Sequence, residues 1–285
     1  MNREIDTKQI GEVQGEVQSI YQSIFPEGDH AFIPKVFGWA DDCFTGKYRD
    51  YQPIDARYHD FEHTLQVTLC MARLMRGWAL EKDIPALTRQ IFELGILAIL
   101  LHDTGYLKKR GDDEGTGAKY TLIHVDRSRQ FAGELMAAKG FTATEIKSVQ
   151  NMICCTGVNV DLCAIPFQSE VEQQAGFALG SADFLGQMAA PNYVEKLPDL
   201  YAEFAESAAY NSGKNDTSRI LFKSADDLIQ KTPAFWEKFV RPKIVGEFRG
   251  VDRFLNDPYP DGPNDYLNRI EENIARVRQK NATGS

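Results

Sequence analysis

Three short segments of the chain carry histidine and aspartate side chains in a combination that can bind divalent cations. They are YHDFEH at 58–63, LHD at 101–103 and SAD at 181–183. The whole chain has five histidines, and three of them lie in the first two segments. Imidazole and carboxylate groups are the N and O ligands that hard-to-borderline divalent metals prefer. On a helical scaffold, this set indicates a metal-dependent hydrolase.

The elements that would position these segments are helices. Apolar residues recur with helical spacing, and no convincing run of alternating β-branched residues is present, so the expected fold class is all-α. The segment 88–101 is apolar on nearly every face, which is typical of a buried central helix. The predicted helices span approximately residues 8–25, 34–44, 60–77, 88–101, 120–139, 142–155, 169–189, 192–210, 217–230, 233–248 and 263–279.

The same residues also have structural interpretations. His63 lies on the apolar stripe of helix 60–77, where a histidine is often a hydrogen-bonded core residue. Asp103 could be a satisfied helix-end aspartate. However, His102 and Asp103 follow a largely apolar run, and a buried ionisable pair is costly there unless a metal or partner compensates it. Asp183 lies among apolar residues and must be paired, capped or metal-bound.

His63, the dipeptide His102-Asp103 and the later Asp183 resemble the H…HD…D signature of the HD-domain metal-dependent phosphohydrolases. The resemblance covers about residues 30–210 and includes the apolar helix that runs into HD and the small residue before the final aspartate. It implies an HD-domain-like helical bundle in which these four side chains bind a divalent metal. It also implies a catalytic role for Asp103, which can bridge to a second, looser ion.

The segment YHDFEH is similar to the Y-H-N-W-x-H segment of the class I cyclic-nucleotide phosphodiesterases, and Ala182-Asp183 is similar to their A-D pair. In that family the second histidine binds the metal and the first donates a proton to the leaving oxygen. The resemblance therefore implies that His63 is a ligand and His59 the general acid. The chain lacks the His-Pro-Gly that follows HD in that family, and it shows no convincing counterpart of the nucleotide-pocket glutamine. Cyclic-nucleotide specificity is not implied.

His124 follows the HD segment at the position where many HD proteins carry an additional histidine. Such a histidine can bind a second metal or hold the bridging water, but His124 could equally be a helix-start residue that faces solvent. Segment 151–159 offers cysteine and threonine where two-metal HD enzymes often carry a further histidine. The expected cofactor is a divalent metal (Mn, Mg, Zn or Fe) in one tight site, with any second site weak or water-rich.

This set of residues supports a direct hydrolytic mechanism. A dication bound by the four ligands would lower the pKa of a bound water to roughly 7 and polarise a phosphoryl oxygen. Hydroxide would attack phosphorus in line, and His59 would protonate the departing alkoxide. The expected reaction is cleavage of a phosphomono- or phosphodiester, with a nucleotide-like substrate.

The Gly-rich segment 107–120 is typical of a mobile loop and directly follows the HD motif. Its cationic side chains could contact substrate phosphates, although a solvated charge run is the alternative because the same loop is acidic. Arg57 is a comparable candidate outside the loop. The candidate loop cations are Lys108, Lys109, Arg110 and Lys119.

Three other functions fit part of the sequence. Residues 59–63 satisfy the H-x-x-E-H pattern of an inverted zincin peptidase, with Glu62 as base, but this leaves the HD pair and the final aspartate unexplained. An HD-type di-iron oxygenase needs more histidine ligands than His63, His102 and His124 provide. A non-catalytic, metal-stabilised or ligand-sensing module is the third alternative.

Composition limits the partners and the compartment. The net charge of −9 argues against a general nucleic-acid binder, but a bound dication could still attract a small phosphorylated substrate. Five cysteines without a CxxC pair predict buried free thiols and, with the polar N-terminal segment, a cytoplasmic location. The longest apolar run, Ile91 to Leu101, is about half a membrane span, so no membrane association is expected.

We expect one domain with peripheral helices. Residues 1–29 would form an N-terminal helix, 30–210 the metal-dependent phosphohydrolase domain, and 211–285 a C-terminal helical extension packed on the same domain. The segment 209–216 is the one plausible internal boundary. The aromatic-rich extension could cover the core or form a homodimer contact.

Overall fold

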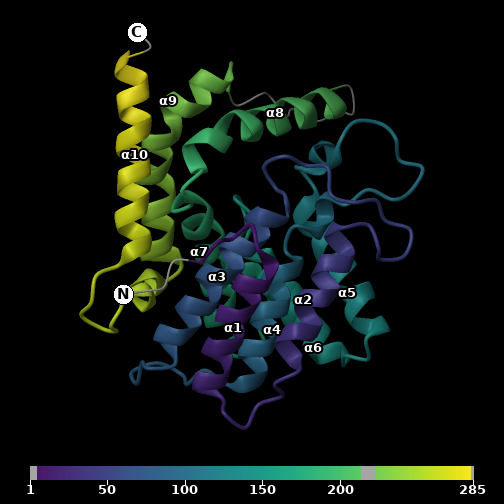
Figure 1. Cartoon of the computed structure of the whole chain (residues 1–285), viewed down its shortest axis with the longest axis vertical. Helices are drawn as coiled ribbons and strands as arrows, with labels where there is room; N and C mark the ends of the chain where they lie inside the picture. Colours follow the sequence, from purple (N-terminus) through teal and green to yellow (C-terminus); the bar gives the residue numbers. More distant parts are fainter. Residues whose placement is uncertain (1–4, 213–221, 284–285) are drawn as a thin grey trace.

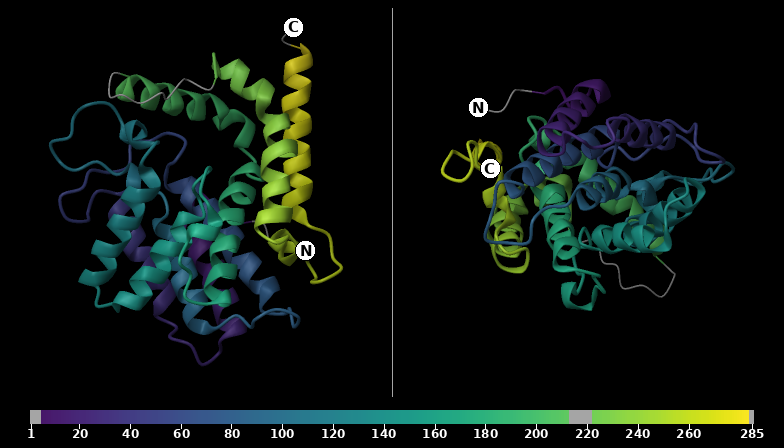
Figure 2. Two further views of the ribbon diagram at one scale, coloured as in Figure 1. Left: turned by 180° about the vertical axis from the view of Figure 1, so that it is seen from behind. Right: turned by 90° about the horizontal axis from the view of Figure 1, so that it is seen from below.

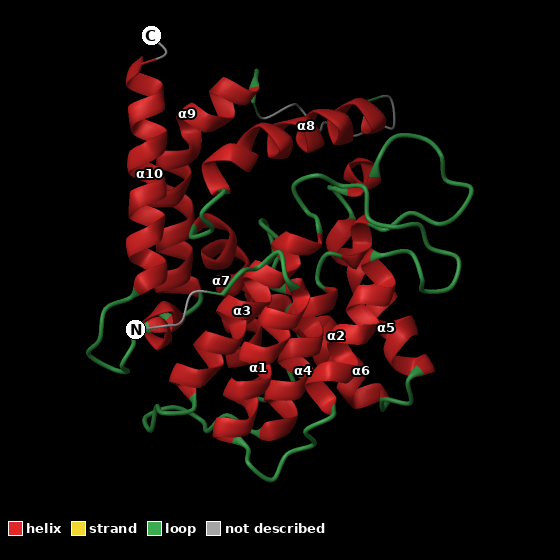
Figure 3. Ribbon diagram, in the orientation of Figure 1, coloured by secondary structure: helices red, strands yellow, loops and turns green. Residues whose placement is uncertain are grey.

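The computed structural model describes residues 5–212 and 222–283 of the chain, and helices dominate its architecture (Figure 1, Figure 3). Within those two ranges there is no β-sheet, so the expected all-α fold class is confirmed. The α-helices are α1 (Ile10–Ile24), α2 (Phe32–Phe44), α3 (Phe61–Trp78), α4 (Arg89–Leu101), α5 (His124–Ala138), α6 (Ala143–Cys154), α7 (Glu170–Met188), α8 (Tyr193–Asn211), α9 (Ala225–Phe235) and α10 (Asp265–Thr283).

Most helix ends agree closely with the prediction, and the differences have local causes. α5 begins at His124 rather than near 120, because Gly117–Tyr120 form a separate 3-10 turn that the Thr116 side chain caps. The predicted helix 217–230 begins outside the described residues. The predicted helix 233–248 is not separate, because α9 continues into two π-helical turns, which are Trp236–Val240 and Lys243–Glu247.

α3 is the central helix of the bundle that α1 to α7 form (Figure 1). It packs against α1, α4 and α7, and nearly all of its side chains are buried. The contact between α3 and α7 is close at Gly186, where an added Cβ would lie 2.8 Å from the Cα of Val67. A side chain at position 186 would therefore push apart the two helices that carry His63 and Asp183.

α1 and α4 complete the same core. The Tyr21 ring on α1 packs against Phe92 of α4 at a centroid distance of 5.5 Å, and its hydroxyl donates to Glu93 at 2.5 Å. The apolar run of α4 is thus buried by neighbouring helices, as its sequence predicts. Across the described ranges, no helix is both long enough and apolar enough to cross a membrane.

The C-terminal helices lie along one side and across one end of this bundle (Figure 1, Figure 2). α9 and α10 run side by side, and α10 also packs against α7. The 3-10 turn Val251–Leu255 packs on α3 at Gly77, where an added Cβ would lie only 2.0 Å from the carbonyl oxygen of Phe254. These contacts join the C-terminal region to the central bundle, and the exact domain division stays a prediction.

Candidate metal centre

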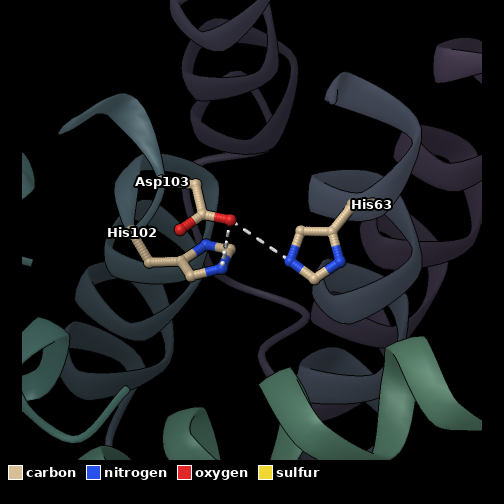
Figure 4. A group of neighbouring side chains, drawn as sticks. All are labelled: His63, His102 and Asp103. Atoms are coloured by element: carbon tan, nitrogen blue, oxygen red, sulfur yellow. Dashed lines mark ion pairs between the residues drawn. The ribbon is translucent and has the colours of Figure 1, made fainter. Parts of the chain in front are cut away.

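Three helices bring the predicted ligands to one point in the bundle. His63 lies in the first turn of α3, where the Asp60 carboxylate caps the helix by accepting a hydrogen bond from the His63 backbone N–H at 2.8 Å. His102 and Asp103 follow the last residue of α4, and Asp183 lies on α7. Ligand atoms of His63, His102 and Asp103 lie within 4.8 Å of one another, and all three side chains are buried (Figure 4).

The spacing of these atoms resembles a coordination shell. Nε2 of His63 lies 3.2 Å from Oδ2 of Asp103 and 3.4 Å from Oδ1 of Asp183. Nε2 of His102 lies 3.2 Å and 3.6 Å from the same two oxygens. Ligand atoms that are each about 2.1 Å from one ion lie about 3.0–3.4 Å apart at octahedral or tetrahedral angles. The ligand atoms of His63, His102 and Asp103 therefore lie at spacings that fit a divalent ion. Asp183 lies near both imidazoles but does not belong to this mutually close group.

The converging atoms also lack hydrogen-bond partners. His63 Nε2, His102 Nε2 and Asp103 Oδ2 are buried and form no hydrogen bond. Each imidazole Nε2 nevertheless lies 3.2 Å from Asp103 Oδ2. Buried polar atoms are rarely left without a partner, so three that face one point fit a metal site. Nδ1 of His102 donates to the carbonyl of Ile99 at 2.7 Å. In the neutral ring this leaves the Nε2 lone pair free for a metal.

Asp183 is held in place by a short chain of hydrogen bonds. The Gln187 amide, one turn later on α7, donates to the Asp183 carboxylate at 3.2 Å and to its backbone carbonyl at 2.8 Å. The Tyr58 hydroxyl in turn donates to the Gln187 side-chain oxygen at 2.6 Å. Asp183 therefore presents Oδ1 to the two imidazoles from a fixed orientation.

The electrostatics of the cluster are those of two imidazoles beside two carboxylates. Burial disfavours the charged form of His63, but the carboxylates of Asp103 and Asp183 outweigh it and raise its pKa to about 9. Burial likewise opposes charge on His102, and the same two carboxylates raise its pKa well above its ordinary value. Despite burial, the imidazoles hold the pKa of both carboxyl groups below its usual range. Without a metal, the cluster retains protons that a metal would displace.

His124 lies nearest to the carboxylate oxygen of Asp103 that His63 and His102 do not approach. Its Nε2 is 3.8 Å from Oδ1 of Asp103, whereas His63 and His102 approach Oδ2. Nδ1 of His124 donates to the Thr121 carbonyl at 2.6 Å, and burial lowers the pKa of the ring. A neutral His124 thus directs a lone pair toward the second oxygen of Asp103, an arrangement that suits a bridging carboxylate.

A glycine permits this placement of His124. Gly105, two residues after Asp103, packs so closely on α5 that an added Cβ would lie 2.0 Å from the His124 carbonyl oxygen. The Gly105 N–H donates to the Ser128 hydroxyl at 2.8 Å. The turn after HD therefore packs directly on the backbone at the start of α5 and is held there by the Ser128 side chain.

His59, the predicted general acid, lies outside α3. The sequence places His59 and His63 on one helical face only if the helix includes Tyr58, but α3 begins at Phe61. Instead, Nδ1 of His59 lies 2.5 Å from Oε2 of Glu203 on α8. The His59 ring also stacks on the buried Tyr106 ring, with centroids 4.5 Å apart.

Glu203 fixes more than the His59 ring. Its other oxygen, Oε1, accepts a hydrogen bond from the backbone N–H of Tyr58 at 2.7 Å. Burial would raise the pKa of Glu203, but His59 and the backbone donors lower it. The Glu203 carboxylate therefore orients the His59 ring through Nδ1.

A known protein family matches the region of the chain that contributes the later residues of this site. The family model described as Npun_R2479-like matches residues 110–253, about half of the chain. The chain belongs to the Npun_R2479-like family. The matched segment contains His124, Asp183 and Glu203, whereas the ligands on α3 and at the end of α4 precede it. No protein in the curated collection matches the chain at a significant level.

The predicted phosphate-binding cations lie in different environments. Lys108 is buried, and its ammonium group contacts Asp55 at 2.9 Å and the Gly115 carbonyl at 2.6 Å. Lys109 is exposed and lies over the Tyr51 ring. Arg57 and Arg110 are also exposed. Their substrate-binding roles stay predictions.

The loop at residues 107–120, which the sequence predicts to be mobile, is held by several hydrogen bonds and ion pairs. Lys119 is buried and bonds to the Asp112 carboxylate and, at 2.6 Å, to the Glu114 carbonyl. Glu206 of α8 accepts hydrogen bonds from both the backbone N–H and the hydroxyl of Thr116. The charged side chains therefore connect parts of the loop to one another, and Thr116 connects the loop to α8.

Proposed function

We propose that this chain is a metal-dependent phosphohydrolase of the HD type. The observation that carries the proposal is the convergence of His63, His102 and Asp103, whose buried ligand atoms have no hydrogen-bond partners. Asp183 adds a carboxylate from α7, 3.4 Å from Nε2 of His63 and 3.6 Å from Nε2 of His102. The order and contexts of these residues are those that resemble the HD signature.

Each part of the reaction has residues suited to it. A divalent ion at the cluster supplies Lewis acidity and lowers the pKa of water to roughly 7. His59, oriented by Glu203, donates the proton that the leaving oxygen needs. Asp103 Oδ1 and His124 offer ligands for a second, weaker ion.

The contacts of Glu62 favour this reaction over a peptidase. An inverted zincin would use Glu62 as the base and both neighbouring histidines as ligands. Here the Glu62 carboxylate accepts hydrogen bonds from Gln66 at 3.3 Å and Asn192 at 3.2 Å, and His59 pairs with Glu203. Glu62 is therefore occupied by structural contacts.

The substrate we propose is a small phosphoester, nucleotide-like in chemistry. The net charge of −9 provides no general attraction for nucleic acid, whereas a bound dication attracts phosphate locally. A cytoplasmic location is part of the proposal, because the five cysteines are free thiols, and such thiols persist in reducing compartments.

Elemental analysis and hydrolysis assays together test this function. We expect purified wild type to bind a divalent metal near stoichiometrically and to hydrolyse bis-p-nitrophenyl or p-nitrophenyl phosphate with added Mn²⁺. Asp103→Asn should lose both properties. Asp126→Asn, at an α5 side chain that is 79% exposed, is the matched control and should retain them. Equal metal retention by Asp103→Asn would overturn the four-ligand site.

Other results of these measurements would distinguish the alternative functions. Metal lost in Asp103→Asn, without hydrolysis by wild type, would support the site and favour a sensor module. Bound iron with oxygen consumption would instead favour a di-iron oxygenase.

A further inference from the structure

A cavity lies between α10 and the π-helical continuation of α9. Its volume is about 450 Å³, which falls in the range of roughly 300–1,000 Å³ that small-molecule sites occupy. None of its lining residues belongs to the metal centre. They are Trp236, Arg241, Ile244, Val245, Asp252, Leu267, Asn268 and Glu271.

The wall of this cavity is apolar and held firmly. Trp236 and Ile244 are each only 2% exposed, so they form the packed base of the cavity. The indole N–H of Trp236 donates to the Glu271 carboxylate at 2.9 Å, which fixes the ring against α10. Val245, 59% exposed, and the half-buried Leu267 present the accessible apolar surface. An apolar group of a ligand could lie along these two side chains.

Two opposite charges line the same cavity without a direct ion pair. In the part of the chain that the structure describes, neither Arg241 nor Asp252 forms one. Burial raises the pKa of Asp252, while the charges of Arg253 and Arg241 oppose this rise. The guanidinium of Arg253 donates to the carbonyls of Arg249 and Gly250 at 2.9 Å and 2.7 Å, and Glu271 is engaged by Trp236. The cavity thus offers a cation and a carboxylate that form no direct ion pair, beside apolar side chains.

The backbone that carries this wall is unusual. Trp236–Val240 and Lys243–Glu247 are π-helical turns, and the cavity residues Arg241, Ile244 and Val245 lie between or within them. π-helical turns are rare and occur frequently at functional sites. The turns therefore provide a second observation, independent of the volume, that singles out this segment.

From these features we infer that the cavity binds a small zwitterion of amino-acid type with an apolar side chain. The ammonium group would pair with Asp252, the carboxylate with Arg241, and the side chain would pack on Val245 and Leu267 above the Trp236 ring. Each half of the ligand then meets an opposite charge that forms no direct ion pair in the described residues. This binding site is independent of the proposed hydrolytic function.

Three related probes test the assignment on the full chain. L-Phenylalanine carries both charges, phenethylamine carries only the ammonium group, and 3-phenylpropionate carries only the carboxylate. With ¹⁵N-labelled tryptophan, the three tryptophans give three indole N–H signals, and Trp236→Phe identifies the relevant one. L-Phenylalanine at up to about 20 mM should shift the Trp236 signal, and each half-ligand should bind at least about tenfold more weakly.

Charge-removing variants assign each contact. Asp252→Asn should weaken L-phenylalanine and phenethylamine but leave 3-phenylpropionate unchanged, and Arg241→Gln should show the reverse pattern. Asp261→Asn, at an exposed residue outside the cavity, should change neither. Because Arg241 is exposed, its variant should fold even if the Asp252 variant does not. The assignment is overturned if no probe shifts the Trp236 signal, or if Arg241→Gln binds L-phenylalanine as tightly as wild type.

Discussion

The carboxylate of Glu203 lies 2.5 Å from Nδ1 of His59, although the two residues are separated by 144 positions in the sequence. This pairing fixes which ring nitrogen of His59 carries its permanent proton. It also joins α8 to the segment that precedes α3. The proton-donor role that we propose for His59 should therefore depend on Glu203, which lies outside the proposed metal cluster.

Glu203→Gln should lower kcat for phosphoester hydrolysis by roughly 10- to 100-fold. The neutral amide would stabilise the Nδ1-protonated tautomer and the positive charge of His59 less than the carboxylate does. Metal content should stay unchanged, since Glu203 contacts none of the four ligands in the hydrogen bonds described above. Glu195→Gln, at a surface position of the same helix, is the control and should match wild type. A variant with normal kcat would remove His59 from the proton-donor role.

Metal binding should release about two protons per ion at pH 7, because neighbouring carboxylates raise the pKa of both His63 and His102 in the metal-free state. The apparent affinity should consequently increase with pH up to about 9, the pKa of His63. Calorimetry in buffers of different ionisation enthalpy measures the release. His63→Gln should reduce it by about one proton, whereas His30→Gln in the exposed loop should not.

The metal-free protein should lose stability as pH rises. His63 has a folded pKa of about 9 against an ordinary value of 6.5, so its contribution is fully present below pH 6.5 and lost as pH rises through 9. The loss is on the order of 3 kcal/mol. Urea denaturation with a chelator present measures it, and His63→Gln should flatten the pH dependence in this window. An unchanged slope would contradict the assigned charge state.

Gln187→Leu should weaken metal binding by roughly 10- to 100-fold, because it removes the donor that orients the Asp183 carboxylate. Tyr58→Phe removes only the outer hydrogen bond and should have a smaller effect in the same direction. Competition with a fluorescent chelator measures both affinities. A larger effect of Tyr58→Phe would show that the hydrogen-bond chain does not act through Gln187.

Gly105→Ala should destabilise the fold by about 2–4 kcal/mol, because its methyl group would meet the His124 carbonyl at 2.0 Å. Gly38→Ala is the matched control. Position 38 lies within α2 with open space around a Cβ, so alanine there should be neutral or slightly stabilising. Urea denaturation compares the two variants, and equal stabilities would show that the turn after HD can shift away from α5.

The sequence predicted the burial of His102 and Asp103, because they follow the apolar run of α4. Asp183 lies among apolar residues of α7, but its side chain stays 15% exposed. Their role as metal ligands stays a prediction. Their convergence on His63 rested on the family resemblance, since spacing along a chain does not specify how three helices pack.

Glu203 was missed for a physical reason. α8 carries several glutamates with ordinary amphipathic spacing, and nothing local distinguishes the one that faces His59. Its role exists only after α8 has folded across the end of the bundle. The signal that could have found it is the requirement that an acid histidine be oriented by a carboxylate or carbonyl.

The loop after HD shows a second limit of prediction from the sequence. Its charges of both signs resemble a solvated segment, but Lys108 and Lys119 are buried against Asp55 and against partners from the same loop. Burial of a charged side chain depends on three-dimensional pairing, which composition does not encode. Segments of mixed charge can therefore form compact structures without an apolar pattern.

The convergence of candidate ligands from α3, the end of α4 and α7 has a consequence for how the protein unfolds. A bound ion would tie together helices that are distant in sequence and would act as a removable cross-link across large loops of the chain. Such ties restrict the unfolded chain most when the enclosed loops are long. Unfolding would have to begin at the periphery or wait for the ion to leave, so chelators should accelerate it.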